Sequence, residues 1–349
     1  MDLTTRYLGL DLRTPLVASS CPLTGRLRHL QRLEDAGISA VVLPSLFEEQ
    51  LVHDSLQVHG VWEETGGVGA EATSYFPDSQ DVQIGARDHL ALVSAAKDAL
   101  SIPVIASLNG VTPGGWASRA RALAAAGADA IELNMYAMAS DPTVPGGDLE
   151  TRQLDLIGEV RDAVAVPLAV KLGPFYSSLA HFAVQVVEAG ADGLVLFNRF
   201  YQPDLDLDAK AVVPRLVLST PEEMRLPLRW VGLLFSQIDA NLALTTGVHS
   251  GMDAAKALLA GADVTMMASA LLLNGPEHVR QVEQELVELL TQHGYDSVTQ
   301  LRGSYSRVSM PDPVGWERAN YLHVLASWAP FQAVGAAQAY RSVSDHAVQ

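Results

Sequence analysis

One pattern of apolar and polar positions recurs four times along the chain. In each copy a helical segment ends at a glycine and a short apolar run follows directly; the copies are residues 36–43, 127–136, 189–196 and 260–267. Glycine is the usual residue where a helix stops in the left-handed conformation. A continuous apolar run is typical of a parallel strand that is buried on both faces. The repeated pattern therefore predicts alternating helices and buried strands.

The same reading extends over most of the chain and predicts eight such strands. The predicted strands are residues 15–20, 40–45, 102–109, 127–136, 167–172, 193–198, 242–247 and 264–269. The predicted helices between and after them are residues 27–36, 88–100, 116–126, 149–164, 178–189, 228–239 and 252–260. We also expect a closing hairpin over residues 3–12, a short helix over residues 47–51, and long connections over residues 46–84 and 199–226.

These elements predict an α/β fold, a (β/α)8 TIM barrel with a C-terminal helical extension. Barrels of this kind reach about 250 residues or more as one unit. We expect residues 1–275 to form an FMN-binding barrel, for the reasons below. Residues 276–349 are expected to form helices only, packed on the barrel.

Polar residues stand at the ends of the predicted strands, where a barrel of this type places its active site. Strands three to six end in Asn109, Asn134, Lys171 and Asn198. A lysine in a core strand is costly without a partner, which favours a ligand or an ion pair. Glu132 is expected to face the barrel interior or a basic group. These residues predict a hydrogen-bonding ring around a planar polar ligand, although Asn109 before a glycine is also typical of a turn.

The remaining strand ends carry small residues. Strand one ends in Ala18 and Ser19 and strand two in Ser45, which leaves room for a flat ligand. Strands seven and eight end in residues that favour a phosphate site at free backbone N–H groups, namely Thr246, Gly247, Ala268 and Ser269. A planar ring, a lysine and a terminal phosphate together describe FMN. A lysine beside a flavin stabilises the negative charge that develops on reduction.

Charge and composition exclude several other classes of function. The 349 residues carry a formal net charge of −17, which argues against nucleic acid and anionic membranes as general partners. Cys21 is the only cysteine, so a disulfide within the chain is excluded and a cytoplasmic location is expected. The sequence predicts no metal site and no membrane span.

In this order and spacing, short motifs resemble those of the dihydroorotate dehydrogenase family of FMN barrels. The resemblance covers roughly residues 3–275 and rests on residues 15–19, 132–134, 170–172, 197–198, 246–248 and 261–271. It implies a CH–CH oxidoreductase of pyrimidine biosynthesis, a homodimer, and an electron-transfer partner subunit. It also implies FMN contacts at Ala18, Ser19, Asn134, Lys171, Asn198, Gly247, Ala268 and Ser269.

The sequence departs from this family where the family removes a proton from dihydroorotate. The family's Cys or Ser base position holds Ala137, a substrate asparagine position holds Ala139, and Pro44 replaces a lysine that the family often carries. Tyr136 and Ser140 are our candidates for proton transfer, with Lys171 in an electrostatic role. Further loop candidates are Tyr75, Tyr176 and Tyr201, whereas Cys21 is more typical of an inert apolar residue.

The sequence thus predicts an FMN-dependent oxidoreductase that acts on a C–C bond of a small substrate. One alternative is an FMN-binding barrel without redox turnover, serving as a carrier or a partner subunit. Another is a flavin-free lyase or aldolase in which Lys171 forms a Schiff base with a carbonyl substrate.

Overall fold

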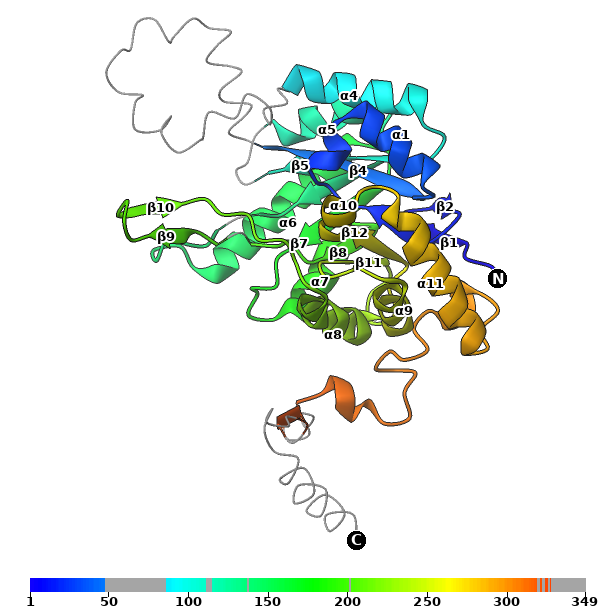
Figure 1. The fold of residues 1–349 in the computed structure, drawn as a ribbon. Coiled ribbons are helices and arrows are strands. Elements are labelled where there is room, and N and C mark those ends of the chain that lie inside the picture. Colours follow the sequence, from blue (N-terminus) through cyan, green and yellow to red (C-terminus); the bar gives the residue numbers. More distant parts are fainter. Residues whose placement is uncertain are drawn as a thin grey trace, which may run out of the picture.

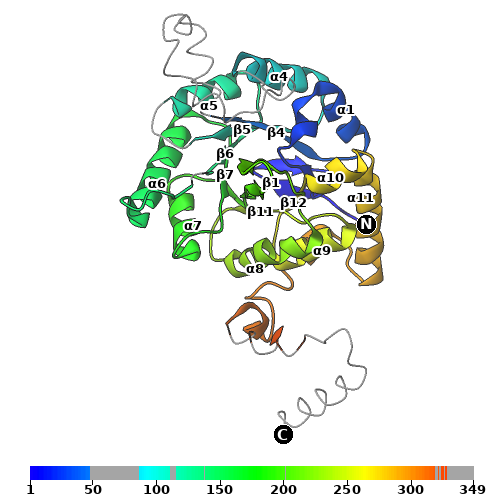
Figure 2. The same cartoon turned by 60° about the vertical axis from the view of Figure 1, so that its left-hand side comes forward.

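The computed structural model describes residues 1–47, 86–110, 115–136, 138–200 and 202–318, with residues 321, 324, 325 and 327. Eight parallel strands form a closed barrel in the order β11-β12-β3-β4-β5-β6-β7-β8. Helices surround the strands on the outside (Figures 1 and 2). The predicted (β/α)8 barrel is confirmed.

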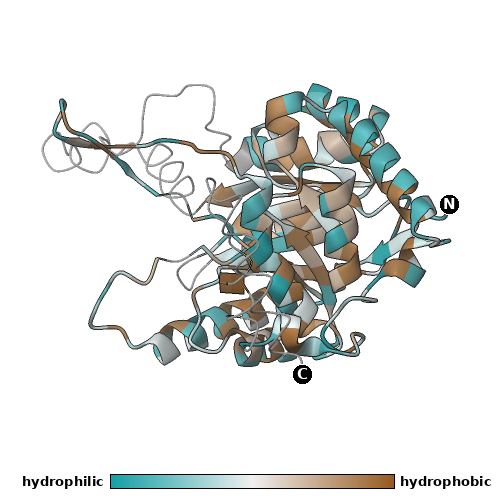
Figure 3. Ribbon diagram, turned by 60° about the horizontal axis from the view of Figure 1, so that its bottom comes forward, coloured by the Kyte–Doolittle hydropathy of each residue, from teal (hydrophilic) through white to brown (hydrophobic). Residues whose placement is uncertain are grey.

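The barrel strands are short and almost entirely buried. They are β3 (Leu16–Ala18), β4 (Ala40–Phe47), β5 (Val104–Asn109), β6 (Ala130–Asn134), β7 (Leu168–Leu172), β8 (Gly193–Leu196), β11 (Asn241–Thr245) and β12 (Val264–Met267). The helices around them are α1 (Leu27–Asp35), α4 (Ala86–Ala99), α5 (Trp116–Ala125), α6 (Gly146–Ala163), α7 (Leu179–Glu188), α8 (Arg225–Leu234), α9 (Gly251–Ala260), α10 (Ser269–Asn274) and α11 (His278–Gln292). Figure 3 shows the apolar strands inside and polar residues on the outward helix faces.

The four glycines of the recurring pattern each have a positive φ, which confirms that each helix stops there. Gly37, Gly127, Gly190 and Gly261 have φ between 102° and 126°. This is the region in which glycine alone pays no steric penalty. The prediction of a glycine stop before each buried strand is therefore correct.

The aspartate two residues after three of these glycines has a structural role that the sequence did not reveal. Each carboxylate accepts a hydrogen bond from a backbone N–H group at the start of a barrel strand. The bonds are Asp129 to Val104 at 2.7 Å, Asp192 to Leu168 at 2.8 Å, and Asp263 to Leu242 at 2.8 Å. Unpaired backbone groups are costly when buried, so the repeated aspartate fixes the N-terminal rim of the barrel.

The N-terminal hairpin closes that rim. It consists of β1 (Thr5–Tyr7) and β2 (Leu10–Leu12), joined through Leu8 and Gly9, which both have positive φ. Tyr7, Leu8 and Leu12 are buried among inward-facing residues from all eight strands. The predicted closing hairpin is confirmed, and this end of the barrel is filled.

Three expectations about loops and boundaries were wrong. Phe47 ends β4 instead of starting a helix, and residues 48–51 lie outside the described residues. Helix α6 begins at Gly146 and not at the expected residue 149. Helix α8 spans Arg225–Leu234 and not residues 228–239. The helix ends before Phe235 because the Phe235 ring packs against Gly261 and Gly303, where a side chain would clash with it.

The connection over residues 199–226 contains a second hairpin that we did not predict. Strands β9 (Asp204–Asp206) and β10 (Ala211–Val213) pair antiparallel, and the Asp206 side chain accepts the N–H groups of Asp208 and Ala209 in the turn. Figure 1 shows this hairpin at the opposite end of the barrel from β1 and β2. The same connection contains the short helix η2 (Pro221–Met224), whose N-cap residue is Thr220.

Residues beyond 275 contact the barrel at several points. Arg302 forms an ion pair with Asp263, Ser297 forms a β-bridge with Asp2, and the Trp316 ring lies where Gly232 has no side chain. These residues include the short helices α12 (Val298–Leu301) and η3 (Pro313–Trp316). The proposed division at residue 275 stays a prediction.

A buried histidine, His89, bonds to a bulge in strand β4, and its titration is expected to make stability depend on pH. The pairing of β4 with β5 shifts between Val42 and Ser45, and His89 of α4 bonds through Nε2 to the Pro44 carbonyl at 2.7 Å. Burial lowers the pKa of His89 below its usual value of 6.5. The unfolded chain therefore takes up this proton first as the pH falls, and stability declines below pH 6.5.

We expect His89→Gln to remove this part of the acid sensitivity, because the amide still donates to Pro44 but does not titrate. Urea denaturation measures how much unfolding free energy the protein loses between pH 7.5 and 5.5. This loss should be smaller in the variant than in the wild type, by less than about 1.4 kcal/mol per pH unit. His293→Gln at an exposed position serves as the control. An unchanged pH profile in His89→Gln would contradict the assignment.

Candidate functional site

Lys171 and Glu132 form a buried ion pair inside the barrel. Lys171 Nζ lies 3.7 Å from Glu132 Oε1 and 3.4 Å from the Ser19 hydroxyl, and both charged side chains are buried. They come from the adjacent strands β7 and β6, whose register pairs Lys171 with Asn134. This confirms that Glu132 faces a basic group in the interior and that Lys171 has an ion partner.

A chain of hydroxyl groups links this pair to Asn134. Ser107 donates to Glu132 Oε1 at 3.4 Å, its hydroxyl lies 2.8 Å from that of Ser45, and Asn134 Nδ2 donates to Ser45 at 3.5 Å. The structure thus brings together Ser19, Ser45, Asn134 and Lys171 as the sequence suggested. Ser107 was missed, although its alternation with Asn109 along β5 places both on one face.

Three buried acceptor atoms at this end of the barrel receive no hydrogen bond within the described residues. They are the side-chain oxygens Asn109 Oδ1, Asn134 Oδ1 and Glu132 Oε2. An unsatisfied buried polar group costs about 1–3 kcal/mol. These atoms are therefore suited to a ligand that brings N–H or O–H donors, and a flavin ring system with its imide N–H is one such ligand.

Asn198 has a different environment from the other asparagines. Its side-chain nitrogen donates to the carbonyls of Met135 at 3.1 Å and Lys171 at 3.2 Å. These bonds hold the ends of β6 and β7 together, so its amide donors are already used. Contact between Asn198 and a cofactor stays a prediction.

Ser219 joins the ends of β11 and β12 at the predicted phosphate end. Its hydroxyl donates to Ser269 Oγ at 2.8 Å and accepts from the Gly247 N–H at 3.3 Å, while its own N–H donates to Ser269 Oγ at 3.0 Å. Ala268 occupies the N-cap position of α10. The sequence identified Gly247, Ala268 and Ser269 but missed Ser219, which lies on the distant connection after β8.

Gly247 lies at a position where no residue with a side chain would fit. Its φ is 79°, and a Cβ atom there would lie 2.7 Å from the Met224 nitrogen and 2.8 Å from the Thr220 oxygen. Both neighbours are backbone atoms and do not move independently. The backbone of Gly247 therefore approaches η2 closely, and this close approach sets the shape of the phosphate end.

The two proposed proton-transfer residues follow β6 but differ in exposure. Tyr136 is half-buried, with its ring stacked on Phe200 at 4.6 Å between centroids, and Ser140 is exposed in the loop. Ala139 is also exposed. Their catalytic roles stay predictions.

The other loop candidates are less suited or lie outside the described residues. Tyr176 packs on Phe182 and donates to Gln153, and burial raises its pKa, so it serves the contact between α6 and α7. Cys21 is buried and burial raises the pKa of its thiol, as an inert residue requires. Tyr75, Tyr201 and Ala137 lie outside the described residues.

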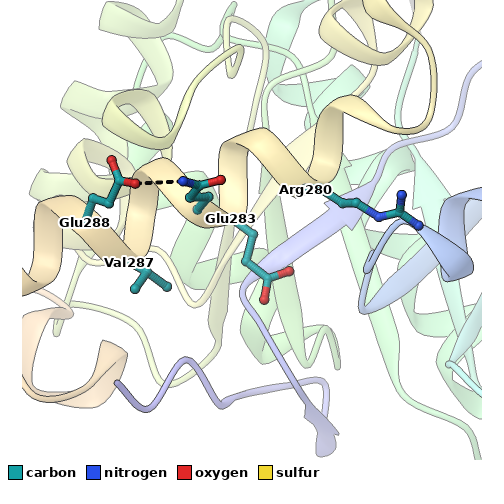
Figure 4. Close-up of a pocket in the computed structure, with 5 residues that line it drawn as sticks. Arg280, Glu283, Val287 and Glu288 are labelled. Carbon is teal, nitrogen blue, oxygen red and sulfur yellow. Dashed lines mark hydrogen bonds between the residues drawn. The ribbon is translucent and has the colours of Figure 1, made fainter.

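A surface hollow lies on α11, away from the strand ends. Figure 4 shows its lining residues, all from this helix, and Gln284 donates to Glu288 there at 2.8 Å. Arg280 and Glu283 bind Asp35 and Arg13, so they join α11 to its neighbours. Because it lacks strand-end residues and buried polar groups, we assign the site to the barrel mouth and not to this hollow.

Two other kinds of feature are absent from the residues that the structure describes. No three histidine, cysteine or acidic side chains of these residues lie together as metal ligands. None of their helices combines the length and apolarity needed to cross a membrane.

Comparison with known proteins agrees with this geometry. A family model described as dihydroorotate dehydrogenase matches residues 83–290. The catalytic subunit of dihydroorotate dehydrogenase B (NAD(+)) from Methanothermobacter thermautotrophicus is 28% identical over 86% of this chain and 97% of its own length. The protein of the same name from Pyrococcus abyssi is 30% identical over 59% of this chain and 70% of its own length.

The closed barrel places the chain in the TIM-barrel class, whose enzymes have their active sites at the C-terminal ends of the strands. With the family match over residues 83–290, the chain belongs to the dihydroorotate dehydrogenase family of oxidoreductases.

Proposed function

We propose that this protein is an FMN-dependent oxidoreductase that forms or reduces a C–C double bond in a small substrate. The observation that carries the proposal is the cluster at the mouth: a buried lysine beside unsatisfied acceptors on Asn109 and Asn134. A planar ring that carries N–H donors and gains negative charge on reduction matches both features. Family membership supplies the oxidoreductase class.

The residues of the mouth have distinct roles in this proposal. FMN, when bound, supplies the two-electron chemistry. Asn109 and Asn134 would hold its ring as hydrogen-bond acceptors, and Lys171 would place a positive charge near the ring, which favours the reduced form. Ala18, Ser19 and Ser45 border the ring, and Asn198 orients the strand ends. Gly247, Ala268, Ser269 and the newly identified Ser219 surround the phosphate.

Dihydroorotate itself is not our preferred substrate. The family's base position holds Ala137, and Pro44 lies in the β4 bulge where the family often has a lysine. Tyr136 and Ser140 remain the candidates for proton transfer. We further propose a homodimer in the cytoplasm that exchanges electrons with a separate subunit, because the relatives named above are catalytic subunits.

The departures at Ala137 and Ala139 favour a second candidate function, an FMN-binding barrel without turnover. The two candidates differ in one measurement. A turnover enzyme holds a flavin that pyridine nucleotides or a substrate reduce, whereas a carrier holds a flavin that stays oxidised with all of them.

The visible absorption spectrum of the purified protein tests the cofactor. We expect flavin bands and release of FMN on denaturation. Asn134→Leu should raise the dissociation constant of FMN about 10-fold, since one buried hydrogen bond contributes about 1.4 kcal/mol. Gln281→Leu, an exposed amide on α11, is the control. A colourless protein that fails to take up FMN would refute both candidates and favour the Schiff-base alternative at Lys171.

A further inference from the structure

We propose that the substrate is an uncharged, planar ring compound that stacks on an aromatic shelf at the barrel mouth. We define the aromatic shelf as Tyr136, Phe175 and Phe200. This inference rests on the proposed function and names its substrate class. The shelf residues follow β6, β7 and β8, three consecutive strands of the barrel, so all three lie at its C-terminal end.

The three rings form one contact series. Tyr136 and Phe200 stack with centroids 4.6 Å apart and planes 17° apart. Phe175 meets Phe200 edge-on, with a centroid distance of 5.3 Å and an interplanar angle of 68°. Offset stacking and edge-to-face contacts are the favourable arrangements for aromatic rings. The shelf is therefore a defined surface and not three independent side chains.

A glycine makes room for the central ring. Gly173 follows β7 directly, and a Cβ atom there would lie 2.8 Å from Cε2 of Phe200. Any larger residue at position 173 would push this ring off the end of β7. The backbone thus permits Phe200 to lie across the strand end, between Tyr136 and Phe175.

The outer part of the shelf is exposed to solvent among the described residues. Phe175 is 77% exposed and Met138, in the loop after β6, is 67% exposed. Exposed apolar side chains that gather at one place mark binding sites. Met138 and Phe175 follow β6 and β7, the strands that carry Asn134 and Lys171.

The charges near the shelf argue against an anionic substrate. Lys171 is held by Glu132, and Arg199 donates to both Glu223 and the Val217 carbonyl. Asn109 and Asn134 are assigned to the FMN ring under the proposed function, and the remaining unsatisfied acceptor, Glu132 Oε2, repels a carboxylate. Within the described part of the mouth, neither cation is thus available to bind one. An uncharged ring suits the apolar shelf and leaves both ion pairs intact.

Cinnamamide and cinnamate test this inference because they share a planar shape and differ in charge. We would titrate each into the purified full-length protein and follow binding by calorimetry and by the flavin spectrum. We expect cinnamamide to bind at least 10-fold more tightly than cinnamate and than dihydroorotate. Equal or tighter binding of either anion would overturn the proposal.

Variants locate the binding surface. Phe200→Leu keeps an apolar side chain but removes the ring, and should weaken cinnamamide binding about 3- to 10-fold, as expected for the loss of an aromatic contact. Tyr321→Leu removes an exposed aromatic ring elsewhere and is the matched control. Phe175→Leu, at a surface position, serves if Phe200→Leu does not fold. Unchanged cinnamamide affinity in the tested shelf variant would overturn the proposal.

The outcomes separate this inference from the proposed function. Calorimetry does not require flavin, so shelf-dependent binding of cinnamamide to a protein without FMN would refute the cofactor and retain the shelf. A protein that holds FMN but prefers cinnamate would retain the cofactor and refute the shelf.

Discussion

Replacing Lys171 with methionine is expected to lower the free energy of unfolding by about 3–5 kcal/mol, because the change leaves Glu132 buried without its partner. Methionine retains the length and much of the volume of the lysine side chain, so the loss of stability is caused by the missing charge and not by a cavity. Urea denaturation, followed by tryptophan fluorescence, measures the effect. The same variant should lose the reduction of bound flavin, because the positive charge next to the ring is gone.

A double variant separates stability from chemistry. Lys171→Met combined with Glu132→Gln removes both charges and should recover most of the lost stability, since replacing a whole buried ion pair is often nearly neutral. Flavin reduction should stay impaired. Glu132→Gln alone leaves the lysine unpaired and should also be destabilising. If Lys171→Met were as stable as the wild type, the two groups would not be coupled as their 3.7 Å distance indicates.

Gly247→Ala is the second change with a large expected effect, about 2–5 kcal/mol of lost stability. The left-handed conformation at φ 79° costs an alanine about 1–2 kcal/mol, and overpacking against the backbone of η2 adds about 1–3 kcal/mol. Moving η2 also displaces Ser219, which accepts the Gly247 N–H. We therefore expect the purified variant to contain little FMN.

Gly158→Ala is the matched control for this substitution. Gly158 lies inside α6, and a Cβ atom there would meet no atom within 4 Å. In a helix interior the same chemical change should stabilise the protein by about 0.5–1 kcal/mol. FMN content should be unaffected. Full FMN content in Gly247→Ala, together with wild-type stability, would contradict the role given to Gly247.

The sequence predicted the barrel because its signals are local and repeated. A glycine stop such as Gly127 and a buried strand such as β6 each depend on a few adjacent residues, and alternation along that strand placed Glu132 and Asn134 on one face. The closing hairpin could be predicted for the same reason. Lys171 stood out because an unpaired lysine in an apolar strand is physically costly.

The features that were missed depend on contacts between distant segments. Ser219 reaches the predicted phosphate site from a connection that carries no regular pattern, and Ser107 resembles any small residue in a buried strand. The three rings of the aromatic shelf are spread over three loops, and only the fold brings them together. The β9–β10 hairpin was obscured by the prolines that flank it.

The filled N-terminal rim has a consequence for kinetics. With Tyr7 and Leu8 packed into that end, a reactant reaches the interior from the opposite end, where the shelf and Lys171 lie. In an assay in which a small-molecule electron acceptor replaces the proposed separate subunit, the substrate and that acceptor then take turns at the same place. Initial-rate plots with both varied should give parallel lines, and each compound should inhibit competitively against the other at high concentration.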